Sequence, residues 1–183
     1  MTDALPIIVG VAGRMGSGKT TIARRLQREF GFQYLRYSEV LADWFQADPN
    51  DKLRLQDVGG GVMFAPEGQL ELNRRLIARI EPRRDVVVDG LRHRVDHESL
   101  QAEFGDRFSL IFVDTPEEVR FRRLVDRFQS REEFLEADSR PVESHIDSLR
   151  SFASVILSGA LAPERTMGSL DSLILDLRAK RVA

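Results

Sequence analysis

Eight residues near the start of the chain have the types and spacing of a phosphate-binding loop. Gly13 is followed by four free positions and then by Gly18, Lys19 and Thr20, with a further glycine at position 16. Glycines let backbone N–H groups approach anionic oxygens closely. Lys19 is then placed to reach the β- and γ-phosphates of a nucleotide, and the Thr20 hydroxyl to bind Mg²⁺. We therefore expect ATP and Mg²⁺ as cofactors. The residues expected to bind the nucleotide are Gly13, Met15, Gly16, Ser17, Gly18, Lys19, Thr20 and Thr21.

Polar residues also follow two later apolar segments. Asp89 and Arg92 come just after Val86 to Val88, and Ser38 follows residues 32–37. In an open parallel sheet the ligand lies beyond the carboxyl ends of the strands, so we expect these three residues to bind the substrate. Asp89 would also bind the metal together with Thr20, and Arg92 would bind a phosphate. The alternatives are a turn aspartate and a surface arginine. Asp114, which follows another such segment, is more simply explained as helping to start a helix.

Arginines are concentrated between residues 120 and 140. Arg123 and Arg127 are four apart, which would place both on one face of a helix. Arg131 and Arg140 flank a predicted break in the helical pattern, where a closing lid would carry its arginines. We expect these four to stabilise charge on a transferred phosphoryl group. For Arg120 and Arg122 we favour the alternative of an exposed helix face paired with nearby acids.

Alternating apolar and amphipathic segments predict a parallel α/β sheet in one domain. Strands are expected at 7–12, 32–37, 85–89, 108–113 and 155–157. Helices are expected at 20–30, from Ser38 as amino-terminal cap to about 47, at 52–58 before a Gly59–Gly61 hinge, near 66–81, and at 95–104. Later helices are expected from a capping box at Thr115 to about 129, from a second box at Ser130 through two short helices to 152, and from Ser169 onward after a loop.

Composition narrows the functional classes. The 183 residues carry a formal charge of −2, no cysteine and three histidines, so a general nucleic-acid binder and a cysteine-ligated metal are not expected. There is neither an apolar run near the roughly 20 residues of a membrane span nor a targeting signal at the start. We expect a cytoplasmic protein with no nucleic-acid or membrane partner.

Together these motifs resemble the nucleoside monophosphate kinase family, which includes adenylate kinase. The resemblance rests on the loop at 13–20, on Ser38, on Asp89-Gly90-Leu91-Arg92 beside the family's Asp-Gly-aromatic-Pro-Arg, and on Arg123 with Arg127 as paired lid arginines. The chain departs from the family at Leu91 and in lacking the proline. The resemblance implies a P-loop NTPase three-layer sandwich spanning 1–183, with a five-stranded parallel sheet, an acceptor-binding insertion at 38–81 and a lid at 123–141. It also implies that Arg92 holds the acceptor phosphate, and Arg123, Arg127, Arg131 and Arg140 the phosphates during transfer.

The implied reaction is Mg-ATP-dependent phosphoryl transfer to a nucleoside or deoxynucleoside monophosphate. Dephospho-coenzyme A kinase is a near relative whose acceptor is a hydroxyl, which benefits from a carboxylate base. That family has an aspartate just after the second strand, where this chain has Tyr37-Ser38-Glu39, so a phosphate acceptor is favoured, although Glu39 or Asp43 could serve. A slow ATPase or nucleotide switch that acts through a protein partner is the third alternative. The acceptor base and sugar, and ATP against GTP as donor, stay open.

Overall fold

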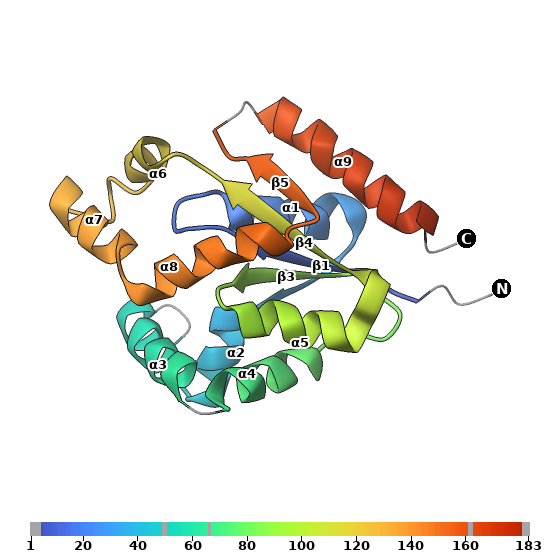
Figure 1. The fold of residues 1–183 in the computed structure, drawn as a ribbon, viewed down its shortest axis with the longest axis horizontal. Coiled ribbons are helices and arrows are strands. Elements are labelled where there is room, and N and C mark those ends of the chain that lie inside the picture. Colours follow the sequence, from blue (N-terminus) through green and yellow to red (C-terminus); the bar gives the residue numbers. More distant parts are fainter. Residues whose placement is uncertain (1–4, 49–50, 66, 161–162, 181–183) are drawn as a thin grey trace.

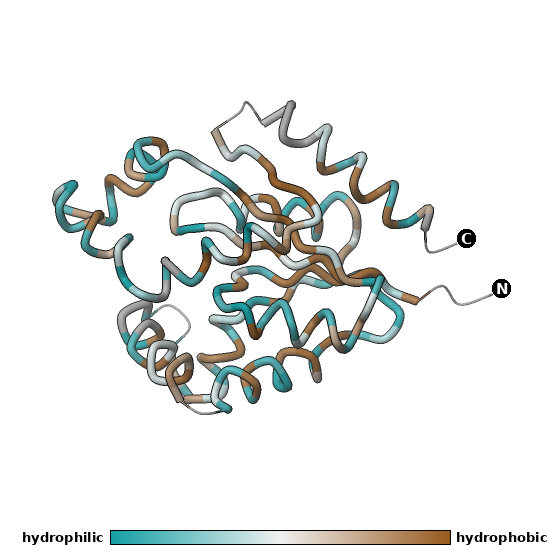
Figure 2. Tube along the Cα trace, viewed as in Figure 1, coloured by the Kyte–Doolittle hydropathy of each residue, from teal (hydrophilic) through white to brown (hydrophobic). Residues whose placement is uncertain are grey.

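A five-stranded parallel sheet forms the centre of the molecule (Figure 1). The computed structural model describes residues 5–48, 51–65, 67–160 and 163–180. The strands, in the spatial order β2-β3-β1-β4-β5, are β1 (Ile8–Ala12), β2 (Gln33–Arg36), β3 (Val86–Leu91), β4 (Phe108–Asp114) and β5 (Val155–Ser158). All five predicted strands, and the parallel α/β class, are therefore confirmed. Hydrophobic residues are concentrated in these central strands (Figure 2).

Helices cover both faces of the sheet and make three layers. Their bounds are α1 (Lys19–Phe30), α2 (Tyr37–Trp44), α3 (Lys52–Phe64), α4 (Gly68–Ile77), α5 (Arg94–Phe104), α6 (Glu117–Arg123), α7 (Arg131–Asp138), α8 (Pro141–Ser148) and α9 (Pro163–Lys180). One apolar cluster joins one face of the sheet to α1 and α9, through residues such as Leu26 and Ile174. Another joins the opposite face to α2, α3, α4, α5 and α8, through residues such as Leu76 and Ile146. Within the described part of the chain, no helix is both long and apolar enough to cross a membrane.

The structure corrects two predictions between the second and third strands. The predicted Gly59–Gly61 hinge is helical, because α3 runs through it, with Leu55 and Val62 buried in the core on either side. Ser38 lies inside α2 and does not cap it, since the helix begins one residue earlier, after Arg36. Pro66, near the predicted start of the next helix, lies outside the described residues, and α4 begins at Gly68.

Later helix boundaries are partly as predicted. Ser130 caps α7 by accepting a hydrogen bond from Glu133 N, as predicted, but the second capping box is only half formed because the Glu133 carboxylate accepts from Gln129 N. The first is wrong, because the Thr115 hydroxyl donates to Ser17 O, 2.9 Å away, and so binds the phosphate loop. The helix that follows ends at Arg123, well short of residue 129. The last helix begins at Pro163 within the predicted loop, so Ser169 does not start it.

Candidate active site

The phosphate loop connects the carboxyl end of β1 to the amino terminus of α1. Its conformation requires glycine at position 16, where φ is 74° and an added Cβ would lie 3.0 Å from Arg120 O. The cap of α1 is Gly18, no side chain accepts from the first turn, and that turn contains no acid. The N–H groups at this helix end are thus available to an anion, which the helix dipole also favours.

Lys19 stands at the start of α1 among other charged groups. Its Nζ lies 3.5 Å from Arg14 O, a backbone carbonyl of the loop. Burial, together with the positive charge of Arg92, lowers its pKa to about 8 in spite of the opposing effects of Asp89 and Glu143. These charges act on one another only because the loop, β3 and α8 meet at this point.

Asp89 at the end of β3 is fully buried beside the loop. Its Oδ2 accepts hydrogen bonds from Thr20 Oγ1 at 2.8 Å and from Tyr34 OH at 2.7 Å. Its Oδ1 has no hydrogen-bond partner among the described residues. A buried carboxylate with an unused oxygen next to a threonine hydroxyl fits Mg²⁺, which prefers such oxygen ligands. The two residues that the sequence predicted as metal ligands are therefore in contact.

A cavity of about 310 Å³ lies beside the loop, between the sheet edge and the helices α2, α3, α4 and α8. Its lining combines basic and apolar side chains with four carboxylates. The basic side chains are Lys19, Arg36, Arg92, Arg127 and Arg140, and the apolar ones include Leu41, Leu55, Met63 and Leu72. Ser38, Asp89, Met15 and Gly16 also line it. The cavity has the composition expected for a ligand with an anionic end and an apolar body.

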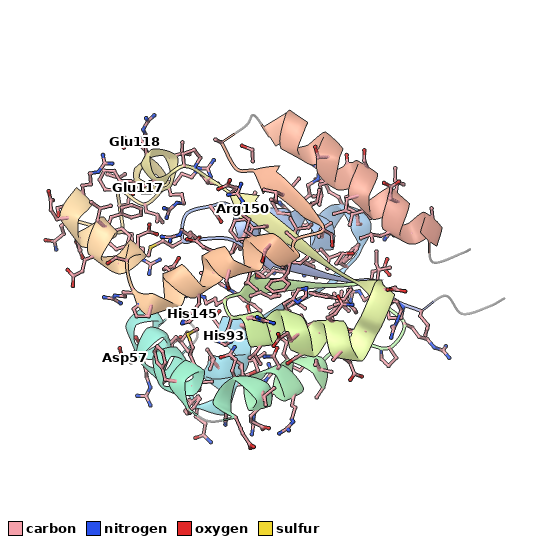
Figure 3. The ribbon with its side chains drawn as sticks, in the orientation of Figure 1. Asp57, His93, Glu117, Glu118, His145 and Arg150 are labelled. Carbon is pink, nitrogen blue, oxygen red and sulfur yellow. The ribbon has the colours of Figure 1, made fainter. Side chains whose placement is uncertain are left out.

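Two of the predicted lid arginines lie outside this cavity. Arg123 donates to Gly16 O, Ser17 O and Gly159 O at 3.3, 3.2 and 2.6 Å, so it contacts the loop. Because α6 ends at Arg123, it does not share a helix face with Arg127, contrary to the prediction. Arg131 pairs with Glu117 and Glu118 of α6, at 3.0 and 2.8 Å. These two glutamates lie far from the centre of the molecule (Figure 3), so the structure does not bring Arg131 to the cavity. Thr21 is exposed in the first turn of α1.

Arg120 overturns a prediction. It was expected on an exposed helix face, but only 4% of it is exposed. Its guanidinium donates to both oxygens of Asp138, at 2.6 and 2.8 Å, and also to Thr115 O at 3.1 Å. Its NH1 also donates to Met15 O in the loop at 3.4 Å, and Arg120 therefore holds α6, α7 and the loop together. Arg122 is exposed and pairs with Glu118 at 3.5 Å, as expected.

Sequence reasoning missed four charged residues of the cavity, which are Arg36, Asp57, Asp96 and Glu143. Arg36 ends β2 next to Asp89 on β3, with 3.8 Å between its Nε and Asp89 Oδ2. The rule that ligands bind beyond strand ends could have found it, but the predicted strand ended one residue too late. Glu143 on α8 approaches Arg92 to 3.6 Å, and no sequence pattern indicated this contact.

The carboxylates considered from sequence lie elsewhere. Asp43 is exposed and pairs with Arg79 at 2.8 Å, and Asp114 is half-buried and pairs with Arg150 at 2.7 Å. Glu39 does not line the cavity. The acids that line it, besides Asp89, are Asp57, Asp96 and Glu143.

Comparison with known proteins bears on the family and the fold. Residues 12–139 match a family model described as an AAA domain. A UPF0200 protein of Pyrobaculum aerophilum is 30% identical over 177 residues, which cover 93% of this chain and 98% of the relative. UMP-CMP kinase 2 of Oryza sativa subsp. japonica is 30% identical over 131 residues, which cover 69% of this chain but 53% of that enzyme.

Solved structures show the same fold. The crystal structure of a sugar kinase from Janibacter sp. superposes with a TM-score of 0.60 at 19% identity, covering 96% of this chain and 98% of the other. The loop, the sheet and these relatives agree, and the chain therefore belongs to the UPF0200 family and has the fold of the small P-loop kinases.

Proposed function

We propose that this protein transfers the γ-phosphoryl group of Mg-ATP to a nucleoside or deoxynucleoside monophosphate in the cytoplasm. The observation that carries the proposal is the position of Arg92, which lines the same cavity as Lys19 of the loop, together with Arg36, Arg127 and Arg140. Two phosphate groups that meet in transfer bring several negative charges together, and such a set of cations neutralises them. In this proposal residues 38–81 hold the acceptor and residues 123–141 form the lid of a single domain.

Each side chain then has a defined task. The loop N–H groups and Lys19 bind the donor phosphates, and Arg123 lies on the same side. Thr20 and Asp89 would hold Mg²⁺, which neutralises phosphate charge when bound. Arg92 holds the acceptor phosphate, while Arg127 and Arg140 act from the lid. Arg131 has no contact with the cavity and takes no part in the arrangement proposed here.

A phosphate acceptor requires no base. Its second pKa is near 6, so it is already ionised at neutral pH and can attack directly. The apolar wall of α2, α3 and α4 has room for a base or sugar beyond the phosphate. The similarity to UMP-CMP kinase 2, a kinase by its name, is consistent with this class of acceptor.

A hydroxyl acceptor is the second candidate, and one observation favours it. Glu143 and Asp57 line the cavity, so carboxylates are near the place where a hydroxyl would lose its proton. The fold is also that of a sugar kinase. Dephospho-coenzyme A is one acceptor of this type. A switch or ATPase that acts through a protein partner needs no second cationic cavity, which makes it the weakest of the three.

The test is an acceptor panel. Ribo- and deoxyribonucleoside monophosphates, their nucleosides, dephospho-coenzyme A and simple sugars are each incubated with Mg-ATP or Mg-GTP. Release of ADP or GDP from the donor and formation of the phosphorylated acceptor are both followed. We expect turnover with at least one monophosphate and none with its nucleoside. Lys19→Met is the control for contaminating kinases, because loss of its ammonium removes charge stabilisation at the γ-phosphate. Phosphorylation of hydroxyl compounds alone would establish the second candidate, and slow ATP hydrolysis alone the third.

A further inference from the structure

One buried glutamate lies between the phosphate loop and Arg92. Glu143 is in the first turn of α8 and is 4% exposed. Its Oε2 accepts a hydrogen bond from Met15 N in the loop, at 3.1 Å, and its Oε1 lies 3.6 Å from Arg92 NH1. A single carboxylate thus contacts both the donor side and the acceptor side of the cavity.

Neighbouring ion pairs hold α8 in this position. Asp147, one turn further along the helix, accepts from Arg14 Nε and NH2 at 2.9 and 2.6 Å. Asp138 of α7 accepts from Arg14 NH1 at 2.9 Å. Loop residues 14 and 15 are therefore attached to α7 and α8 through three carboxylates. Glu143 is the one among them that also lines the cavity.

The surroundings of Glu143 are those of a bound phosphate. A backbone N–H of a phosphate loop and a guanidinium are typical phosphate ligands, and both are engaged here by a carboxylate. We propose that Glu143 acts as a surrogate anion, which occupies a phosphate position between Met15 and Arg92 in the substrate-free protein and leaves it when a substrate phosphate binds. The inference rests on the phosphate binding of the proposed function, and it does not depend on the identity of the acceptor.

The charge of Glu143 then sets how strongly the phosphate position between Met15 and Arg92 binds anions. A phosphate must displace or approach a buried negative charge, and like charges a few ångströms apart repel strongly at low effective dielectric. A phosphate group carries about −1.5 to −2 charges at neutral pH against −1 for the carboxylate, so it can compete for the Met15 N–H and for the positive charge of Arg92. The site is thereby selective for ligands with more than one negative charge.

The experiment compares Glu143→Gln with the wild type. The glutamine oxygen can still accept from Met15 N, while the negative charge is lost. Glu136→Gln on α7 is the matched control, because Glu136 is exposed and does not line the cavity. Calorimetric titration with inorganic pyrophosphate should give at least about tenfold tighter binding to Glu143→Gln, and unchanged binding to Glu136→Gln. Unchanged or weaker binding to Glu143→Gln would overturn the proposal.

A second measurement uses the wild type alone, in case the variant does not fold. The Met15 amide resonance should shift on addition of pyrophosphate, because its carboxylate partner is exchanged for phosphate. A Met15 resonance that stays in place while other loop amides shift contradicts the surrogate-anion role.

Kinetics separates the surrogate anion from a general base. If Glu143→Gln loses turnover more than about a hundredfold with unchanged pyrophosphate affinity, Glu143 is a base for a hydroxyl acceptor and the proposal is wrong. If pyrophosphate binds more tightly to Glu143→Gln but the wild type phosphorylates no monophosphate, the inference stands and the proposed function fails.

Discussion

Removing Asp138 should destabilise the protein by several kcal/mol, because the change leaves a buried charge without its partner. Asp138 accepts from Arg120 through both oxygens and from Arg14 through one, and Arg120 is 4% exposed. Breaking such a buried pair from one side costs about 3–5 kcal/mol. At roughly 2–4 °C of melting temperature per kcal/mol for a domain of this size, Asp138→Ala should melt about 6–20 °C below the wild type.

Urea denaturation and calorimetry measure this loss. Glu118→Ala is the control, because it removes an exposed pair with Arg131, whose side chain is 48% exposed, and should change stability by no more than about 1 kcal/mol. A loss below about 1 kcal/mol for Asp138→Ala would refute the reasoning, since Arg120 would then have found water or another partner.

The same pair predicts a pH dependence. Burial alone would raise the pKa of Asp138, but hydrogen bonds and charge from Arg120 and Arg14 outweigh it and hold that pKa below its ordinary value. The stability that this carboxylate contributes is therefore full above the pKa of the unfolded chain, near 3.9, and is lost as pH falls through the lower folded value. The difference between wild type and Asp138→Ala should be constant above about pH 5 and should shrink only in acid.

Three further predictions concern the cavity. Arg92→Ala should lower acceptor kcat/KM by an amount equivalent to at least about 2 kcal/mol, with little change in ATP affinity. Arg94→Ala is the control and should change neither quantity, because the Arg94 side chain is exposed and pairs with Glu98. Equal effects in both variants would contradict the phosphate role of Arg92. Gly60→Leu should raise acceptor KM without loss of stability, because a Cβ there meets nothing within 4 Å and position 60 lines the cavity. Gly61→Leu, equally unhindered but outside the cavity, is the control, and similar KM values in the two variants would exclude this location for the acceptor. Nucleotide binding should weaken above about pH 8, where Lys19 of the nucleotide-free protein loses its proton. At pH 9 calorimetry in buffers of different ionisation enthalpy should record proton uptake, because Lys19 must regain its proton to bind the phosphates. Absence of uptake would mean that Lys19 stays charged.

Local patterns predicted most of the fold because the apolar composition of each strand indicates that it is buried. Strands covered on both faces are continuous apolar runs. The segments Val86 to Val88 and Phe108 to Val113 have this composition, and both lie in buried strands. Boundaries failed where tertiary contacts outweighed local preference. Three successive glycines favour a break, yet α3 continues through them because the residues on either side of them pack into the core.

The loop and Asp89 were predictable for a related reason. Their chemistry depends on short sequence spacing and on the end of one strand, both of which are visible in a single segment. Glu143 is different, because it lies 128 positions from Met15 and follows an ordinary helix start. Its function arises only when α8 packs against the loop.

The arginines between 120 and 140 show the same limit most clearly. In sequence they form one basic segment, and spacing was the only means of ranking them. In the structure their acidic partners separate them, since Arg120 is neutralised by a buried aspartate and Arg131 by two exposed glutamates, whereas Arg127 and Arg140 line the cavity. The position of each arginine relative to the cavity thus depends on where the fold places it, and Arg120 and Arg131 are held away from the cavity by the carboxylates that they contact. Those carboxylates lie as far away as 18 positions for Arg120, beyond any helical repeat.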